Sequence, residues 1–144
     1  MPGENLAVGV YWLHMSPNPV VHFEMPYQDA ARVSAFYQDT FGWKMLPLGA
    51  EMGEYVMAHA SETDEHNMVK NPGTINGGFY KKNSDAANTN IVIKVGDIEA
   101  VLRKVKGAGG EVMDGPTGIP GVGMYANIRD TEGNRVALMQ PMQK

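Results

Sequence analysis

The sequence contains no cysteine, no excess of basic residues and no apolar run long enough to span a membrane. The missing cysteines exclude disulfide bonds, zinc–thiolate sites and cysteine nucleophiles. The apolar stretch Leu6–Met15 is shorter than the roughly 20 residues that a transmembrane helix needs, and no positively charged segment precedes it. We interpret residues 1–19 as an N-terminal arm or extra strand that could pack on a partner subunit. We expect a cytoplasmic protein with no membrane partner.

The charge balance argues against a nucleic-acid partner. Sixteen acidic and twelve basic residues give a formal net charge of −4, whereas nucleic-acid-binding domains present a basic surface. Hydrophobic residues make up 43% and charged residues 19% of the 144 positions, which is an ordinary globular composition. This length fits one domain with its own hydrophobic core.

An internal repeat organises the chain after the arm. When the sequence is aligned with itself so that His22 lies over Asn90, Asp29 lies over Asp97. Each aspartate is placed to cap the N-terminus of a helix, because its side chain can accept from free backbone N–H groups. Apolar residues recur at helical spacing after both aspartates, and Gly107 is expected to end the second helix.

Short strand-like segments surround both predicted helices, so each half reads strand, helix, strand, strand, strand. We expect an α+β fold made of two tandem βαβββ modules, residues 20–81 and 89–141, in a single domain over residues 20–141. The predicted strands are residues 21–25, 43–48, 54–58 and 74–80 in the first module, and residues 91–95, 111–113, 124–129 and 135–140 in the second.

Three segments together are similar to one known family. They are VVHFEMPYQDAARVSAFYQDTFGW at residues 20–43, GDIEAVLRKVKGAGGEV at residues 96–112, and IPGVGMYANIRDTEGNRVALMQP at residues 119–141. They resemble the glyoxalase/bleomycin resistance protein/extradiol dioxygenase (vicinal oxygen chelate) superfamily. This resemblance implies curved mixed sheets that form a cup for a small molecule, and it implies a homodimer. Enzymes of the family hold a divalent metal in the cup.

The metal ligands that the resemblance implies are incomplete in this sequence. The family's ligands on the first and last strands of each module fall on His22, Gly77, Asn90 and Ala137. Glycine and alanine have no donor atom, whereas catalytic zinc and iron sites take about three histidine or carboxylate ligands. We therefore expect no metal cofactor; the alternative is a divalent metal that uses His22, with ligands recruited from Glu24, His59 or His66.

Strand alternation places several polar side chains inside the expected cup. His22 and Glu24 share one face of the first strand, and the same parity points Asn90 and Arg135 inward. We expect the small residues at the ligand positions to enlarge the cavity. An inward carboxylate is costly unless it is paired, so Arg135 is the candidate partner of Glu24. Glu24 is also the candidate general base.

Aromatic residues near the strand ends add a flat surface to the expected cup. Tyr55 and Tyr125 are candidates to line a pocket, although such residues are more often part of a core or a dimer contact. The candidate ligand-binding residues are therefore His22, Glu24, Asn90, Arg135, Tyr55 and Tyr125.

Two classes of function remain open from the sequence. The leading hypothesis is a glyoxalase-like protein that binds a small organic molecule without the usual metal centre, as bleomycin-resistance-like proteins do, or that catalyses unusual chemistry on it. The alternative is a metal-dependent enzyme, either a lactoylglutathione-lyase-like lyase or a dioxygenase. A third hypothesis is a dimeric interaction module without a ligand.

Overall fold

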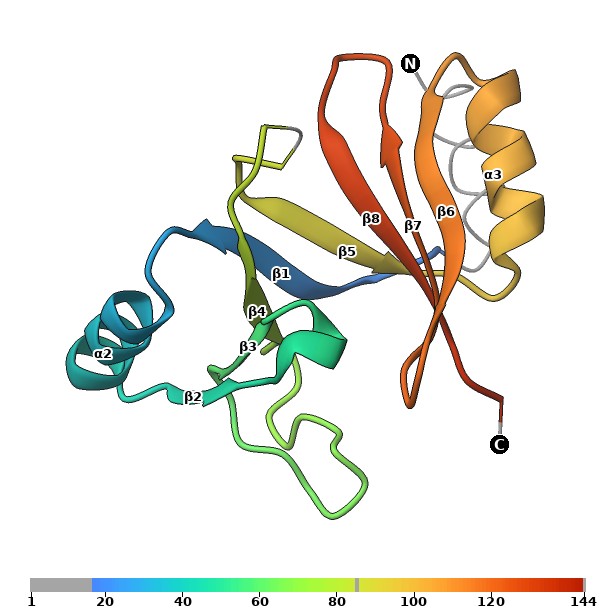
Figure 1. Ribbon diagram of the computed structural model, residues 1–144. Coiled ribbons are helices and arrows are strands. Elements are labelled where there is room, and N and C mark those ends of the chain that lie inside the picture. The colour runs from blue at the N-terminus through green and yellow to red at the C-terminus, as the bar shows by residue number, and fades with distance from the viewer. Residues whose placement is uncertain (1–16, 85, 144) are drawn as a thin grey trace, which may run out of the picture.

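The computed structural model describes residues 17–84 and 86–143, which form one open eight-stranded sheet with helices on its outer side (Figure 1). The strands run in the order β2-β3-β4-β1-β5-β8-β7-β6. Their bounds are β1 Val20–Tyr27, β2 Lys44–Pro47, β3 Val56–His59, β4 Asn76–Lys81, β5 Asn90–Lys94, β6 Glu111–Ile119, β7 Gly123–Arg129 and β8 Arg135–Pro141. The helices are α2 Ala30–Phe41 and α3 Ile98–Gly107, with a 3-10 turn η1 at Ala50–Met52.

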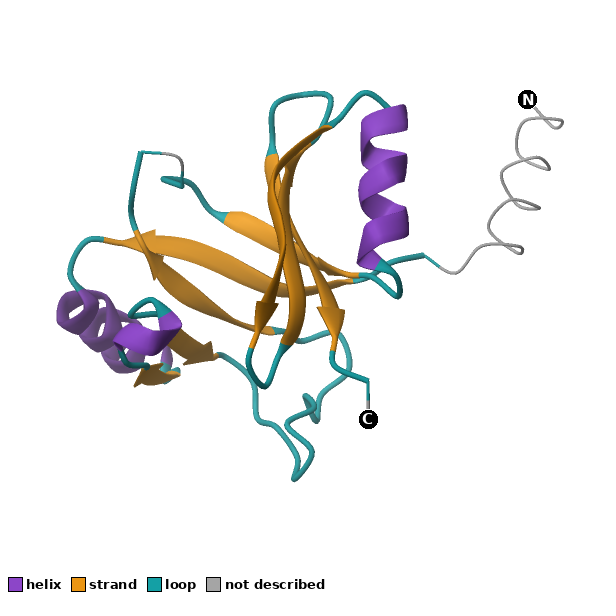
Figure 2. Cartoon of the chain, turned by 45° about the vertical axis from the view of Figure 1, so that its right-hand side comes forward, coloured by secondary structure: helices purple, strands orange, loops and turns teal. Residues whose placement is uncertain are grey.

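The strand order confirms the predicted α+β fold with two modules. The first module contributes β4 and β1 as a parallel pair, and the second contributes β5 and β8 as its counterpart. The two modules join where β1 and β5 pair in antiparallel fashion, and the remaining neighbours are antiparallel as well. The sheet is therefore mixed, and it curves away from the helices so that its other face is concave (Figure 2).

Both helices begin at the predicted caps. The Asp29 side chain accepts from the backbone N–H of Arg32 at 2.9 Å, and the Asp97 side chain accepts from that of Ala100 at 3.1 Å. The end of α3 differs by one residue from the expectation, because Gly107 is its last helical residue and the cap follows at position 108.

The apolar core lies between the sheet and the helices as two clusters, one in each module. The cluster under α3 contains the buried residues Val95, Ile98, Leu102, Ala126, Ile128 and Leu138. The cluster near α2 contains Tyr27, Val56, Ala58 and Phe79, with Tyr37 and Trp43 packed against it. Because the apolar side chains of each strand point towards the helices, its other side chains form the concave face.

Two further sequence predictions concern strand β6 and the N-terminal arm. Strand β6 continues to Ile119, well past the expected end at residue 113. The glycines and proline in its second half hide the strand pattern, but an edge strand tolerates them where its register shifts. The expected N-terminal arm lies mostly outside the described residues. Within the described residues, no helix is long and apolar enough to cross a membrane.

Candidate functional site

The concave face carries a row of polar residues along the middle of the sheet. Glu24 on β1 pairs with Gly78 on β4 and with Asn90 on β5. Since Val92 pairs with Ala137, the same register brings Arg135 beside Asn90. Directly paired residues on neighbouring strands share a face, so a carboxylate, an amide and a guanidinium follow one another across three strands.

Glu24 lies at the centre of this row and is only 9% exposed. The Tyr125 hydroxyl, which comes from β7, donates to Glu24 Oε1. Tyr55, which precedes β3, approaches the same carboxylate from the first module and hydrogen bonds to it. Each module therefore contributes one phenol to the same buried carboxylate. Tyr55, Tyr125 and Glu24, which are far apart in the sequence, converge at this point.

The environment of the two phenols keeps them protonated. Burial raises the pKa of Tyr55 far above its usual value, and the charge and hydrogen bonding of Glu24 add to that rise. Burial likewise raises the pKa of Tyr125 above its usual value; Glu24 and the nearby Tyr55 add to the rise, and the charge of Arg135 opposes it. Deprotonation would place a second negative charge beside a carboxylate at low dielectric. The phenols are therefore held as hydrogen-bond donors towards Glu24.

The space expected at the small ligand positions is filled in the first module. A Cβ added to Gly78 would lie 2.1 Å from the Tyr55 ring and hydroxyl, so this ring occupies the volume that a side chain at position 78 would take. The cavity was predicted at Gly77, but the glycine on the concave face is Gly78, and the Tyr55 ring takes its space, so the prediction is wrong on this side of the cup. Glycine at position 78 admits the phenol that contacts Glu24.

The expected equivalence between Gly77 and Ala137 is also shifted by one residue. Ala137 pairs with Val92, and the counterpart of Val92 in the repeat is Glu24, which pairs with Gly78. Gly77 faces the helix side, where an added Cβ would lie 2.3 Å from the carbonyl oxygen of Phe23. The long loop before β4 has no counterpart in the second module, and it obscured this register in the sequence.

His22 is held by the backbone of the neighbouring strand. Its Nδ1 lies 2.9 Å from the carbonyl oxygen of Asn76. A carbonyl only accepts, so Nδ1 carries the proton in this hydrogen bond. His22 is half-buried on the same face as Glu24.

Arg135 and Glu24 do not form the ion pair that the sequence suggested. Within the described residues, no carboxylate lies within 4.0 Å of the Arg135 guanidinium. Asn90 stands between the two residues and is 3% exposed. In the amide orientation that satisfies both groups, its oxygen accepts from Arg135 Nη1 at 3.3 Å and its nitrogen donates to the Arg135 carbonyl at 3.2 Å. Strand order thus separates the two charges.

The residues at the family's ligand positions do not fit a catalytic metal ion. His22 and Asn90 are the donor-bearing members, and Gly78 and Ala137 supply no donor atom. In residues 17–84 and 86–143, no group of three histidine or carboxylate side chains is close enough to hold a metal. His66, considered as a recruited ligand, contacts Glu65 at 3.4 Å on an exposed loop.

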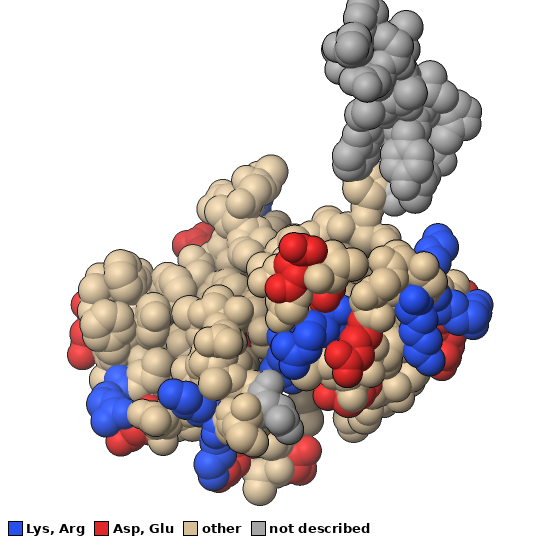
Figure 3. Space-filling model, turned by 90° about the horizontal axis from the view of Figure 1, so that it is seen from above, with Lys and Arg blue, Asp and Glu red and all other residues tan. Residues whose placement is uncertain are grey.

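Surface features elsewhere lack this convergence of polar groups. One hollow lies beside the β6–β7 turn and is lined largely by glycine, proline and methionine; another lies at the start of α2, next to Asp29 and Arg32. On the face seen in Figure 3, acidic and basic side chains are interspersed and neither forms a broad patch. The concave face therefore remains the best candidate site.

Comparisons with known proteins agree with this architecture. The family model of the Glyoxalase/Bleomycin resistance protein/Dioxygenase superfamily matches residues 20–138. Comparison with curated protein sequences finds no match.

Solved structures show the same fold at low sequence identity. A hypothetical protein from Bacillus halodurans has a TM-score of 0.63 and 14% identity, over 90% of this chain and 98% of that chain. A variant of Streptomyces coelicolor methylmalonyl-CoA epimerase in complex with 2-nitronate-propionyl-CoA has a TM-score of 0.65 and 14% identity, over 89% of this chain and 100% of that chain. Methylmalonyl-CoA epimerase from Mycobacterium tuberculosis has a TM-score of 0.60 and 15% identity, over 90% and 95%. These structures show the fold, and the family model over residues 20–138 shows that the chain belongs to the glyoxalase/bleomycin resistance protein/dioxygenase superfamily.

Proposed function

We propose that this chain binds a small organic molecule on its concave face through its own polar side chains, without the metal centre of the family's enzymes. The observation that carries the proposal is the Glu24 carboxylate, buried at the middle of the sheet and contacted by phenols from both modules. Small-molecule sites typically combine apolar walls with a few convergent polar groups. The Glu24 region supplies the convergent polar groups.

The energetics of Glu24 support a role beyond packing. A carboxylate in the middle of a sheet loses hydration on folding, and the hydrogen bonds of Tyr55 and Tyr125 offset that cost. An apolar residue would fill the same position with less need for partners. A ligand that hydrogen bonds to the carboxylate and to a phenol at the same time would use these preformed polar atoms.

Glu24 is also the group best placed for proton transfer, if the bound molecule is a substrate. A general base must lie within hydrogen-bond reach of the proton that it removes. A ligand on the concave face would contact Glu24 and the two phenols, which remain protonated. A carboxylate that can accept a proton and neutral hydroxyls that can donate hydrogen bonds therefore lie side by side. The epimerases among the solved relatives support the fold alone, because their identity to this chain is so low.

A ligand screen tests the proposal on the full chain. Thermal melting with a panel of small carboxylates, amides and phenols should identify at least one compound that raises the Tm of the wild type. In Glu24→Gln, the affinity for that compound should fall about tenfold, because a hydrogen bond to a charged group is lost. In Tyr125→Phe it should fall less, because the lost group is a neutral phenol.

Tyr27→Phe provides the matched control. The Tyr27 hydroxyl donates to the Glu54 carbonyl at 2.6 Å, so this variant removes a tyrosine hydrogen bond away from Glu24. It should lower stability without changing ligand affinity. If Glu24→Gln lowers stability but binds every compound as the wild type does, Glu24 is a structural residue; if no compound raises the Tm, the binding proposal fails.

The expected homodimer is a separate proposal. Its support is the family resemblance together with the exposed apolar side chains of α2, Phe36 and Phe41. Size-exclusion chromatography with light scattering should give twice the mass of the 15.7 kDa chain. A monomer at micromolar concentration would contradict it.

A further inference from the structure

Arg135 is a half-buried cation on the concave face whose charge has no partner of opposite sign in the described residues. Its Nε atom is buried and has no hydrogen-bond partner there. Arg129, the next arginine along the same row, differs: it lies 4.0 Å from Glu111 and donates to the Gly133 carbonyl at 3.1 Å. Arg135 is therefore the concave-face arginine left with unused charge.

The Arg135 side chain is held in place by neutral groups. Its Cζ lies 6.0 Å from the centre of the Tyr80 ring, a distance at which a cation is attracted to the aromatic face. Asn90 accepts from Nη1, and the Tyr80 hydroxyl is itself fixed by donating to the Asn88 carbonyl. The guanidinium is consequently oriented before any ligand arrives, so binding would immobilise little additional side chain.

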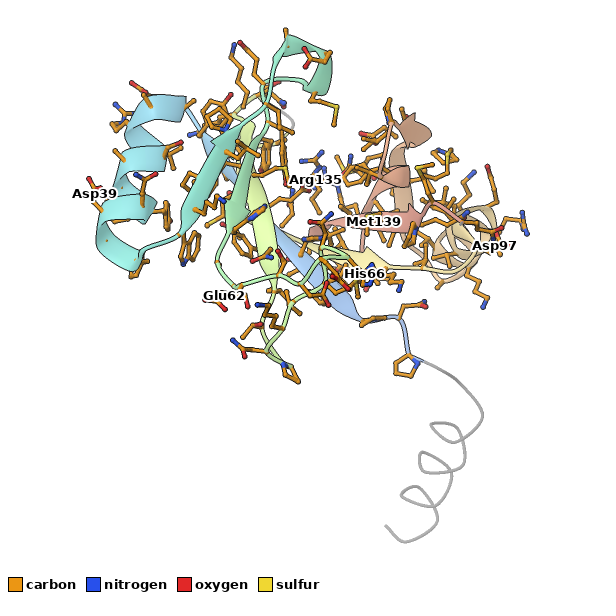
Figure 4. The ribbon with its side chains drawn as sticks, turned by 90° about the horizontal axis from the view of Figure 1, so that it is seen from below. Asp39, Glu62, His66, Asp97, Arg135 and Met139 are labelled. Atoms are coloured by element: carbon orange, nitrogen blue, oxygen red, sulfur yellow. The ribbon has the colours of Figure 1, made fainter. Side chains whose placement is uncertain are left out.

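The unused donors suit one chemical group. A guanidinium carries five N–H donors in a planar fork that matches the two oxygens of a carboxylate. Asn90 and Tyr80 engage only part of that fork. Figure 4 shows the Arg135 side chain between the two halves of the molecule.

We propose that Arg135 binds the carboxylate of the small molecule held on the concave face; this rests on the proposed function and names its ligand class as small organic monocarboxylates. Asn90 separates Glu24 from Arg135, so their backbones are roughly 10 Å apart, twice the spacing of neighbouring strands. The anionic end of the ligand lies at Arg135, and its uncharged end points towards Glu24 and the two phenols. A second carboxylate at that end would be repelled by Glu24.

Pairs of acids and their amides test this assignment directly. Benzoate and benzamide, together with short aliphatic carboxylates and their amides, are titrated into the full chain and followed by melting temperature and calorimetry. In the wild type, at least one acid should bind about tenfold or more tightly than its amide, because a hydrogen-bonded charge pair is lost in the amide. The corresponding dicarboxylate should bind more weakly than the monocarboxylate.

Three variants separate charge from folding. Arg135→Met should remove the preference for acid over amide, and Arg135→Lys should keep part of it, because the charge remains while the fork is lost. Arg103→Met changes the net charge equally on the exposed surface of α3 and should leave the preference intact. The comparison of acid and amide in the wild type holds even if Arg135→Met fails to fold.

The outcomes distinguish the two proposals. If amides bind as tightly as acids in the wild type, or Arg135→Met and Arg135→Lys retain the full preference, the carboxylate assignment is overturned while the binding function stands. If neither acids, amides nor the other members of the screening panel bind, both proposals fail together.

Discussion

The two modules share one order of elements but differ in how their helices pack. Helix α3 buries Ile98 and Leu102 in the core of the second module. No residue of α2 is buried, and Phe36 and Phe41 remain 54% and 60% exposed. The first helix is held instead by ring contacts such as that between Tyr37 and Trp43, whose centroids are 4.8 Å apart. The repeat therefore specifies topology, while the second module carries more of the buried aliphatic core.

The last strands of the modules show the same divergence. Where β8 carries Val136 and Ala137, β4 carries Gly77 and Gly78. The glycines allow close approach of the Phe23 backbone on one face and of the Tyr55 ring on the other. The last strand of the first module thus has two glycines where β8 has side chains, and this allows the Tyr55 phenol to lie against Glu24.

The largest expected difference between the modules lies in the helices. Leu102→Ala should lower the free energy of unfolding by about 2–5 kcal/mol, because it leaves a cavity in a packed core. Phe36→Ala should cost about 1 kcal/mol or less, since much of that ring remains in water. Urea unfolding of both variants measures the contrast, and equal losses would show that α2 is packed as tightly as α3 in solution.

The glycines of β4 give the next largest effect. Gly77→Ala should destabilise the chain by about 1–3 kcal/mol, because the new methyl group meets both the backbone carbonyl and the ring of Phe23. The control is Gly96→Ala, where nothing lies within 4 Å of the added atom and φ is not positive. That change should be neutral or slightly stabilising. A neutral Gly77→Ala, measured by the same urea unfolding, would contradict the close approach of β1 and β4.

Tyr55 and Tyr125, the phenols that contact Glu24 from the two modules, should make the free energy of unfolding decrease in alkaline solution. The pKa values of Tyr55 and Tyr125 are raised in the folded chain above their usual value of 10.0. Above about pH 10, the unfolded chain therefore loses protons that the folded chain keeps, and each tyrosine lowers stability by up to about 1.4 kcal/mol per pH unit. Below that pH, both states keep the protons and the contribution is constant.

Tyr125→Phe should reduce the steepness of this alkaline loss. Urea unfolding between neutral pH and about pH 11 measures the slope for the wild type and the variant. Equal slopes for the wild type and Tyr125→Phe would show that Tyr125 is not shielded by Glu24 and its surroundings.

Local patterns were sufficient to predict the modules. The capping positions Asp29 and Asp97 begin both helices as expected, and the alternating segments around His22 and Asn90 became β1 and β5. Capping and strand alternation depend on neighbours within a few residues, so one sequence reveals them. The family resemblance was also predicted from these segments, and the family match over residues 20–138 confirms it.

The details of the site depended on contacts that no local pattern contains. The position of Tyr55 over Gly78 and the place of Asn90 between Glu24 and Arg135 follow from strand order and register. The loop before β4 interrupts the repeat, so the register there was displaced by one residue, which moves a side chain to the opposite face. Sequence alone therefore named the polar residues of the cup but gave Glu24 the wrong partner.

Metal analysis of the chain, purified without chelator, tests most directly whether the concave face functions without a metal ion. We predict less than stoichiometric zinc, iron, manganese or nickel, and no change in melting temperature when these cations or a chelator are added. One equivalent of bound metal that is lost in His22→Ala, together with a rise in melting temperature on adding the cation, would contradict the proposal and favour the lyase or dioxygenase alternative.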